Sequence, residues 1–480
     1  MKTARRSIKP EEASVAMLGE RQAPPTVAAR AALLVLLAMS LLISAQATSE
    51  PTGRNLLFIA IDDLRDWTGY SGQYEGAIFT PNIDALANAS TRYLRAYTTL
   101  PSCLGSRTSV MLGLSPATHG VGLFSSSSPG VNSAEFRAIY GNADILSLPE
   151  VLRGHGYYTA AAGKVFHQQL PDRWQEVGPE TRIAELFNAF EPGPDDTFIV
   201  PQVLDPATVH PDQAVADWGA AFIRDYASSE PFFLALGFYQ PHLPWRVPQW
   251  AYDFYPLEEV VAQKSSPRDL DDEPVGAREL AASPIIDGVA QYDRVEAAGK
   301  AAEYTQAYLA SVTHTDAMLG EVIEALQRSP YAENTDILLW SDHGYHLGDK
   351  FHWRKQTFWE AAVRVPLLIS SPGNAQYPVG DESQPVSLLD IAPTVLELAG
   401  LPRFAQFEGL PLSRAREGRD VKIFLGKGQA RLRNGIKVVD YDRTREQGLN
   451  DLSAYWLALD PYEEVNIIVP LVEAILGRSE

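Results

Sequence analysis

The sequence has a single cysteine, Cys103, among its 480 residues. One cysteine cannot form a disulfide within the chain, which excludes a disulfide framework. A lone cysteine is most often a small buried hydrophobic side chain. The thiol of Cys103 is therefore inert in a core, paired between chains or chemically active, and the sequence around it has to distinguish these three cases.

Positive charge is also scarce. The chain has 40 Lys and Arg residues against 60 Asp and Glu residues, which gives a net charge of −20. A chain of this charge is not expected to bind nucleic acid or an anionic membrane, so neither is predicted as a partner. An anionic substrate is compatible with this charge only where Lys, Arg and His line the site locally.

Long apolar segments are missing from most of the chain. The longest run, Ala31–Ser44, follows Arg30 and is short for a membrane span. Ala45-Gln46-Ala47 after it has the small-x-small pattern of a signal-peptidase site. We therefore expect residues 1–47 to be a signal peptide and the mature protein to be periplasmic or secreted, with no membrane span after the signal peptide is removed.

Shorter apolar runs recur along the chain without the polar alternation of a half-exposed strand. Such runs are typical of strands buried on both faces of a parallel sheet. The predicted strands are Asn55–Ile61, Tyr157–Ala162, Pro231–Phe238, Thr335–Ser341 and Val365–Ser370. The predicted helices between and after them are Thr80–Leu86, Ser147–Leu152, Ala214–Tyr226, Ala301–Leu326 and Leu388–Ala399. This alternation predicts an α/β fold with a large, mostly parallel sheet sandwiched by helices.

The pattern changes in two places. Tyr252–Lys300 has no clear periodicity, so we expect it to run over the surface. Beyond a boundary near Leu401–Glu408 the pattern predicts three short alternating strands and a closing helix. These segments are Val421–Phe424, Ile436–Val439, Tyr455–Leu459 and Val469–Leu476. We therefore divide the mature chain into an α/β domain over residues 48–402 and a smaller α+β subdomain over residues 403–480.

Polar residues follow the ends of four predicted strands. They are Asp62 and Asp63, Lys164 and His167, His242, and Asp342 and His343. In open α/β sheets ligands bind outside the carboxyl ends of the strands, so these residues are expected to share one crevice. Three carboxylates in one crevice repel each other unless a cation is present. A ligand set rich in oxygen favours Ca²⁺ or Mg²⁺ over Zn²⁺.

Cys103 stands at the start of a further predicted helix. Pro101 and Ser102 interrupt regular structure, and Ser106–Leu112 continues as a helix. A helix N-terminus has unsatisfied N–H donors and the positive end of the helix dipole. That environment lowers the pKa of a thiol and also suits a bound sulfate or phosphate.

A set of motifs then occurs in order along most of the mature chain. It comprises NLLFIAIDDLR (Asn55–Arg65), PNIDALA (Pro81–Ala87), CLGSR (Cys103–Arg107), GLSPATHGV (Gly113–Val121), GKVFH (Gly163–His167), PFFLALGFYQPHLPW (Pro231–Trp245), SDHGYHLGDKFHWRK (Ser341–Lys355), RVPLLI (Arg364–Ile369), SLLDIAPTVLELAGLP (Ser387–Pro402) and LALDPYEEVNI (Leu457–Ile467). In these motifs the chain resembles the type I, formylglycine-dependent sulfatases of the alkaline phosphatase superfamily, specifically the iduronate-2-sulfatase-like branch. The resemblance implies an alkaline phosphatase-like fold and a sulfuric-ester hydrolase acting on a sulfated saccharide.

The resemblance also implies roles for individual residues. Cys103 matches the cysteine that a formylglycine-generating enzyme oxidises to formylglycine, and Arg107 matches the residue that holds the formylglycine hydrate. One divalent cation, usually Ca²⁺, would be bound by Asp62, Asp63, Cys103, Asp342 and His343. The remaining matches are Lys164 and Lys355 for sulfate binding, His167 for proton removal in the release step, and His242 for protonation of the leaving alcohol.

Two positions depart from the family pattern and leave alternatives open. The family has Pro or Ala where this chain has Gly105, and close relatives commonly have Lys where it has Gln240. A first alternative is a phosphonate or phosphodiester hydrolase of the same superfamily. A second is a non-catalytic relative that binds sulfated glycans, which Gly105 alone supports.

Overall fold

The computed structural model describes residues 53–122, 134–180, 201–286, 288–415, 419–442 and 451–468. These residues belong to one compact unit, Ser49–Glu480. The predicted signal peptide over residues 1–47 and the predicted closing helix Val469–Leu476 lie outside the described residues. Among the described helices, none combines the length and the apolar character needed to cross a membrane.

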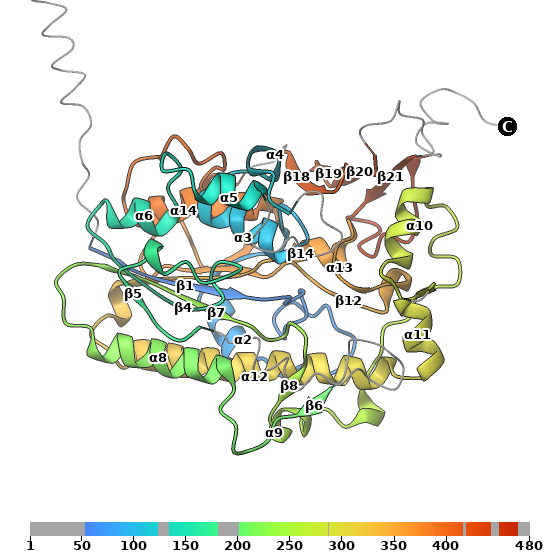
Figure 1. The fold of residues 1–480 in the computed structure, drawn as a ribbon, viewed down its shortest axis with the longest axis horizontal. Helices are drawn as coiled ribbons and strands as arrows, with labels where there is room; N and C mark the ends of the chain where they lie inside the picture. Colours follow the sequence, from blue (N-terminus) through green and yellow to red (C-terminus); the bar gives the residue numbers. More distant parts are fainter. Residues whose placement is uncertain are drawn as a thin grey trace, which may run out of the picture. The chain divides into compact units, whose positions relative to one another are not determined.

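An eight-stranded sheet runs through the centre of this unit (Figure 1). In spatial order its strands are β16 (Gly380–Glu382), β2 (Thr91–Tyr93), β15 (Leu367–Ser370), β11 (Thr335–Ser341), β1 (Asn55–Ile61), β7 (Phe232–Phe238), β4 (Tyr158–Gly163) and β5 (Glu176–Val177). All neighbours are parallel except β15, which is antiparallel to both β11 and β2. The predicted α/β fold with a mostly parallel sheet is therefore confirmed.

The central strand β1 is buried along its whole length. Leu57, Ile59 and Ile61 pack into the hydrophobic core on one face of the sheet. Leu56, Phe58 and Ala60 pack into the core on the other face. Burial on both faces removes the need for polar alternation, which is why the sequence of this strand is continuously apolar.

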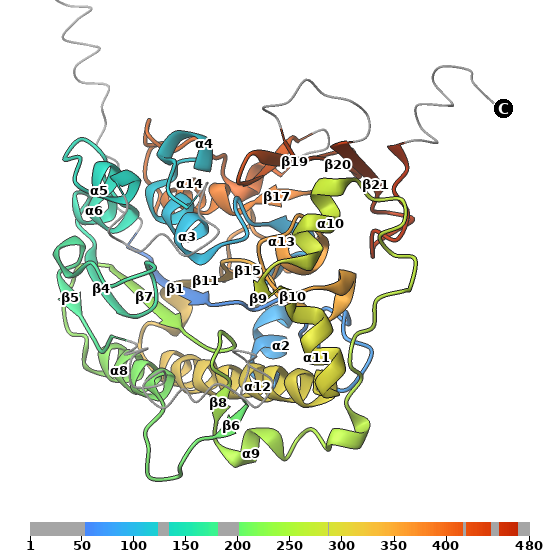
Figure 2. The same ribbon diagram turned by 45° about the vertical axis from the view of Figure 1, so that its right-hand side comes forward.

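Helices cover both faces of the sheet (Figures 1 and 2). One layer contains α2 (Pro81–Asn88), α8 (Pro211–Asp225) and α12 (Ala301–Gln327), and α12 packs against the other two. The opposite layer contains α3 (Cys103–Leu112), α5 (Ala134–Tyr140), α6 (Leu148–Arg153) and α14 (Ile391–Leu398). The helices predicted over these segments are confirmed, and α12, at 27 residues, is the long helix that the pattern predicts.

The predicted strand Val365–Ser370 is wrong in detail because Pro366 interrupts it. The chain forms β14 (Arg364–Val365) before the proline and β15 after it. Proline has no N–H to donate to a ladder, so a continuous strand cannot pass through it. β14 pairs instead with β3 (Ala96–Tyr97), which lies beside β17 (Val386–Ser387) in a three-stranded sheet.

The C-terminal region contains a four-stranded antiparallel sheet. Its strands are β18 (Val421–Leu425), β19 (Gly428–Arg433), β20 (Ile436–Asp440) and β21 (Leu452–Trp456). The sequence pattern missed β19, whose arginines are on its exposed face, and placed the last strand several residues too late. The division of the chain at residues 402 and 403 stays a prediction.

Tyr252–Lys300 has more regular structure than its sequence indicates. It contains α10 (Val275–Ala282) and α11 (Gln291–Ala298), each only eight residues long. Two turns of helix are too few for a periodic pattern to stand out. Ala277 and Ala281 of α10 pack into a core cluster that also contains Phe358 and Trp359. The segment therefore connects the C-terminal sheet with the loop that follows β11.

Candidate active site

Three carboxylates meet where β1 and β11 end. The two strands are parallel and in register from Asn55↔Thr335 to Ile61↔Ser341, so Asp62 and Asp342 follow paired positions. Asp62 and Asp342 are fully buried and Asp63 is 1% exposed. The N–H of Asp63 donates to Oδ1 of Asp342 at 3.2 Å. Asp63 has a left-handed φ of 61°, a strained conformation that typically clusters at functional sites.

Cys103 begins α3 beside these carboxylates. Its Sγ lies 3.0 Å from Nζ of Lys355 and 3.3 Å from Nε2 of His343. Donor atoms of Asp62, Cys103, Asp342 and His343 all lie within 4.8 Å of one another. The thiol is 5% exposed, but its neighbours are charged and polar groups rather than core side chains. Cys103 thus lies at a helix start and beside the carboxylates that follow β1 and β11.

Arg107 links the helix to both strand ends. It lies one turn after Cys103, so both side chains are on the same face of α3. Its Nε donates to Oδ2 of Asp342 at 2.7 Å, and Nη2 donates to Oδ1 of Asp62 at 3.3 Å. Nη1 donates to the carbonyl oxygens of Lys164 and Val165. Burial lowers the pKa of Arg107, but the two carboxylates outweigh it and the net pKa is raised, so Arg107 is a permanent cation.

Two lysines complete the charged cluster. Nζ of Lys164 forms an ion pair with Asp62, and Nζ of Lys355 donates to Oδ1 of Asp63 at 2.7 Å. Lys164 reaches this position because β4 and β7 approach closely at Gly237. A Cβ on Gly237 would lie 2.1 Å from the backbone of Lys164, so only glycine fits. Burial lowers the pKa of Lys355, but Asp63 and its neighbours outweigh burial and raise it well above the ordinary value.

The cluster contains three side-chain cations as well as three carboxylates. Arg107, Lys164 and Lys355 balance the three carboxylates, so repulsion alone does not require a further cation. A metal is indicated instead by Oδ2 of Asp63, which is buried and has no hydrogen-bond partner among the described residues. Burial also raises the pKa of Asp63, which means that its charge is under-compensated. The donor types fit a hard divalent cation, because three of the four non-sulfur groups are carboxylates.

His343 and Asp62 have pKa values that reflect this crowding. Burial lowers the pKa of His343, but the charge of Asp342 outweighs it and raises the pKa to about 9, so His343 has to give up its proton when it binds a cation. Burial raises the pKa of Asp62, but the charges of Lys164, Arg107 and Lys355 outweigh it and hold the pKa well below the usual range. Asp62 is thus an anion at every physiological pH, as a metal ligand has to be.

The other two predicted histidines, His242 and His167, follow β7 and β4. Nε2 of His242 lies 3.9 Å from Oδ2 of Asp63, and its Nδ1 lies 2.6 Å from the carbonyl oxygen of Leu243. Burial lowers the pKa of His242 well below its usual range. His167 follows β4, and burial together with the charge of Lys164 lowers its pKa to about 3. Both imidazoles are therefore neutral, with a nitrogen able to accept a proton.

Some residues of the site were not found from the sequence. Oγ of Ser106 donates to the carbonyl oxygen of Asp342 at 2.6 Å and so ties α3 to the end of β11. Gln240 is fully buried and its Nε2 donates to the carbonyl oxygen of Pro244 at 2.9 Å. Because the Gln240 side chain lies inside the loop, the lack of Lys at this position says nothing about the charge of the substrate. No sequence pattern distinguishes such internal contacts.

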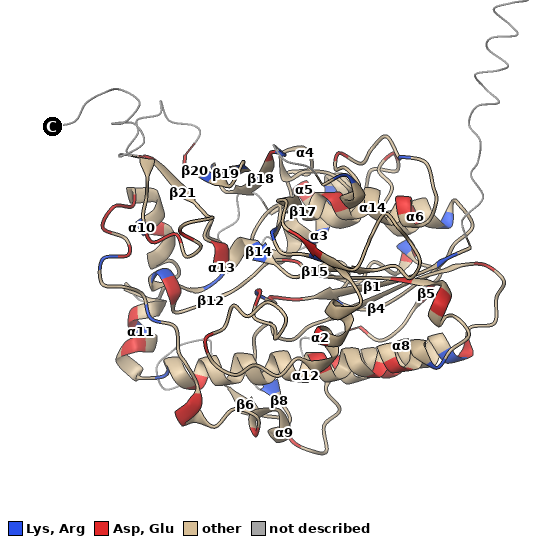
Figure 3. Cartoon of the chain, turned by 180° about the vertical axis from the view of Figure 1, so that it is seen from behind, with Lys and Arg blue, Asp and Glu red and all other residues tan. Residues whose placement is uncertain are grey.

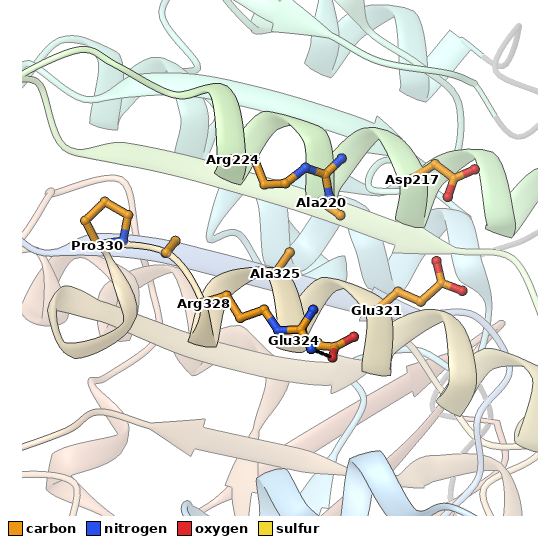
Figure 4. A pocket seen from close by; sticks show the side chains of 9 residues that line it. Asp217, Ala220, Arg224, Glu321, Glu324, Ala325, Arg328 and Pro330 are labelled. Carbon is orange, nitrogen blue, oxygen red and sulfur yellow. Dashed lines mark ion pairs between the residues drawn. The ribbon is translucent and has the colours of Figure 1, made fainter.

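The charged groups of the site contrast with those on the rest of the surface. Figure 3 shows acidic residues on α8 and α11, and of these Asp217, Asp225, Asp293 and Glu296 are exposed. A pocket between α8 and α12 is also charged (Figure 4), but it holds none of the predicted site residues. Its Arg328 is already paired with Glu324. The strand-end cluster is therefore the candidate active site.

Comparison with known proteins agrees with this assignment. A family model described as Sulfatase matches residues 54–401, which include every predicted site residue. The chain belongs to the sulfatase family. A sulfatase of Formosa agariphila is 31% identical to it over 451 residues, which cover 88% of this chain and 84% of that protein. The iduronate 2-sulfatase of Mus musculus is 28% identical over 412 residues, covering 75% of this chain and 71% of that protein.

Solved structures share the fold of this sulfatase. One, in complex with its substrate D-glucosamine-2-N,6-O-disulfate, has a TM-score of 0.66 and 19% identity, and the match covers 88% of this chain and 95% of that one. The phosphonate monoester hydrolase of Silicibacter pomeroyi has a TM-score of 0.67 and 19% identity, with 88% and 92% covered. At this identity the likeness shows the fold alone. The predicted resemblance to sulfatases, including iduronate 2-sulfatases, is confirmed by the family match and the relatives.

Proposed function

We propose that this sulfatase removes sulfate from a sulfated carbohydrate, with a formylglycine derived from Cys103 and one divalent cation, Ca²⁺. The observation that carries the proposal is the position of the Cys103 Sγ, 3.0 Å from Lys355 Nζ and 3.3 Å from His343 Nε2. That position is at a helix N-terminus and beside three buried carboxylates, where an anionic ester and a cation can be bound together.

The residues that would hold the cation are Asp62, Asp63, Asp342 and His343, together with the modified side chain of residue 103. The unpartnered Oδ2 of Asp63 supports this set. The bound cation would supply a positive charge that stabilises negative charge on the transferring sulfuryl group. Carboxylates that bind the cation would attract Lys164 and Lys355 less strongly, so the ammonium groups of these lysines become available to sulfate oxygens.

Formylglycine, once a water has added to its aldehyde to give the hydrate, would supply a nucleophilic hydroxyl at the position that the thiol of Cys103 now occupies. Arg107 supports this role because it lies one helical turn away and is fixed by Asp62 and Asp342. Lys164 and Lys355 would bind the sulfate and orient it for in-line attack. The maturation of Cys103 requires a formylglycine-generating enzyme as a partner of the nascent chain.

His242 would protonate the leaving group. Its Nδ1 faces the carbonyl oxygen of Leu243, so Nε2 is the nitrogen that points to the site. A bound sulfate ester raises the pKa of the ring through its negative charge, and Nε2 takes up a proton. When the bond between sulfur and the ester oxygen breaks, its electron pair stays on that oxygen, and the proton on Nε2 passes to it to give the alcohol.

His167 would act in the second half of the reaction. Burial and Lys164 keep it neutral, with its pKa lowered to about 3, so it is free to accept a proton. That proton would come from the remaining hydroxyl of residue 103, while the aldehyde C=O re-forms and the bond between its carbon and the sulfate oxygen breaks to release sulfate. The sulfate product is an anion, and the groups around it are cations.

We propose that the mature enzyme is periplasmic or secreted, where extracellular sulfated saccharides are available.

Gly105 does not favour the non-catalytic alternative. A Cβ at this position would lie 2.8 Å from Cδ2 of Leu100 and 3.0 Å from the carbonyl oxygen of Val121. Close packing thus favours glycine at this position in this chain, a reason that is independent of activity. The phosphonate hydrolase alternative rests on a shared fold, and no residue of the described site favours it.

The proposal is tested by sulfate release and cation content measured together. Wild-type protein should bind one divalent cation per chain, release sulfate from a sulfated saccharide, and lose activity when a chelator removes the cation. Asp342→Ala should lose the cation and the activity together, because Asp342 also fixes Arg107. Full turnover by Asp342→Ala would show that the ligand assignment is wrong, and a wild-type protein that cleaves phosphonate esters but no sulfate ester would favour the alternative.

A further inference from the structure

A buried carboxylate lies behind the loop that carries His242. Asp212 is in the first turn of α8 and is fully buried. Its Oδ1 accepts the N–H of Tyr239 at 2.7 Å, and its Oδ2 accepts the N–H of Gln240 at 2.9 Å. These are the first two amides after β7, and His242 follows two residues later. One carboxylate thus holds both amides at the point where the chain turns into the site.

The rest of the loop is internally bonded. Nε1 of Trp245 donates to the carbonyl oxygen of Pro241 at 2.6 Å, and Tyr239 Oη donates to that of Leu243 at 2.5 Å. From α12, Thr315 Oγ1 donates to the carbonyl oxygen of Gln240 at 3.1 Å. These bonds make the loop a stiff unit, and hydrogen bonds with Asp212 of α8 and Thr315 of α12 tie it to the two helices.

Two buried histidines beside Asp212 do not turn this cluster into a metal site. His210, Asp212 and His314 offer donor atoms within 4.8 Å of one another. However, Nδ1 of His210 accepts the N–H of Asp212 at 3.0 Å, so the hydrogen of the neutral ring is on Nε2. A metal ligand needs a free lone pair, and the usual arrangement has the other ring nitrogen donating rather than accepting. His210 therefore caps α8 by accepting the backbone N–H of Asp212.

We infer that Asp212 is a positioning residue, which fixes the backbone of Tyr239 and Gln240 and thereby sets where His242 presents Nε2 to the leaving oxygen. This inference rests on the proposed function, in which His242 protonates the leaving alcohol. An asparagine at position 212 keeps the shape of the side chain but turns one acceptor into a donor that faces an N–H. The loop then has to shift or leave that N–H unsatisfied.

The chemistry provides a readout that a merely structural role would not change. An alkoxide is a poor leaving group and needs the proton of His242, whereas nitrophenolate leaves without one. Displacing His242 should therefore slow alkyl and sugar sulfates far more than an aryl sulfate. A general loss of folding would lower both rates by the same factor.

The experiment compares Asp212→Asn with wild type in the full mature protein. We expect kcat for a sugar sulfate to fall by roughly 10²-fold, the usual worth of a proton donor, with KM changed little. We expect kcat for 4-nitrophenyl sulfate to fall by no more than about threefold on the same reasoning. The double variant Asp212→Asn/His242→Gln should be no slower than His242→Gln alone, because both changes remove the same function.

Asp316 provides a matched control. It is a buried carboxylate on α12 that accepts the N–H groups of Ile83 at 2.7 Å and Asn82 at 3.2 Å, at the start of α2. Asp316→Asn should lower stability without changing the ratio of the kcat values for the two substrates. Thr315→Val is a milder change at the same loop. It should shift the ratio of the two kcat values in the same direction as Asp212→Asn, and it can be used if Asp212→Asn does not fold.

Amide hydrogen exchange separates this inference from the proposed function, because it needs no turnover. Exchange in the peptide spanning residues 238–245 should rise in Asp212→Asn and not in Asp316→Asn. An equal loss on both substrates, additive effects in the double variant, or unchanged exchange would overturn the positioning role. If wild type cleaves neither sulfate while exchange still rises in Asp212→Asn, the positioning role is supported and the proposed sulfatase chemistry is overturned.

Discussion

Gly105 lies where two other segments press against the first turn of α3. The side chain of Leu100 and the backbone of Val121 occupy the space that a Pro ring would need, and the Cα of Gly122 is packed against the same turn. The sequence shows only that a common motif residue is replaced. The replacement is explained by contacts with Leu100, five residues before Gly105, and Val121, sixteen residues after it. No local sequence pattern reveals these contacts.

Replacing Gly105 with the proline of the family motif should therefore be harmful. Leu100 can move, but the Val121 carbonyl is backbone, so Gly105→Pro should cost about 1–3 kcal/mol of folding free energy by overpacking. The measurement is thermal unfolding of Gly105→Pro and of the double variant Leu100→Ala/Gly105→Pro. Removing Leu100 should recover part of the loss. A proline variant as stable as wild type would mean that this turn has room for the ring.

Strand ends and helix starts are the elements that the sequence predicts best at this site. Asp62, Asp63, Asp342 and His343 follow continuous apolar runs, and the parallel register of β1 and β11 then brings them together. Asp212 escaped prediction because its role depends on a contact between α8 and a loop 27 residues away. The short elements β19, α10 and α11 also escaped prediction from the sequence.

The segment before Lys355 is held to the rest of the chain by a buried ion pair. Lys350 Nζ lies 2.6 Å from Oδ1 of Asp269, and their side chains are 6% and 8% exposed. Lys350 also donates to the carbonyl oxygen of Glu463. Positive φ values at Lys350, Phe351 and Arg354 show that the backbone here is strained, so the pair restrains a segment that would relax without it.

Lys350→Met should accordingly destabilise the protein. It leaves Asp269 buried and unpaired, which typically costs about 3–5 kcal/mol. Asp269→Asn in the same chain should restore part of this loss by removing the stranded charge. Chemical denaturation of the two single variants and the double variant measures the coupling. Strictly additive effects would show that the pair contributes nothing to this attachment.

At the scale of the whole molecule, buried histidines set the response to acid. His119, His314 and His352 are 4%, 1% and 2% exposed. Burial lowers the pKa of each from 6.5 to about 3. Below pH 6.5 the unfolded chain binds protons that the folded chain cannot take up until about pH 3, so stability falls as the pH falls through this window.

Each of these histidines should remove about 2 kcal/mol of stability between pH 7 and pH 5, if the unfolded pKa is about 6.5. His119→Gln removes one of the three groups without adding a charge. The free energy of unfolding of this variant should therefore decline less steeply with acid than that of wild type. Denaturation curves at pH 7, 6 and 5 test this, and superimposable pH profiles would contradict the role of His119.

The central claim, that Cys103 is the precursor of the nucleophile, is tested most directly by mass spectrometry. The measurement is the mass of the peptide that contains residue 103, from mature protein with measured sulfatase turnover. This peptide is expected to be about 18 Da lighter than its cysteine form, because CH₂SH has become CHO. An unmodified thiol at Cys103 in fully active protein would contradict this role of Cys103.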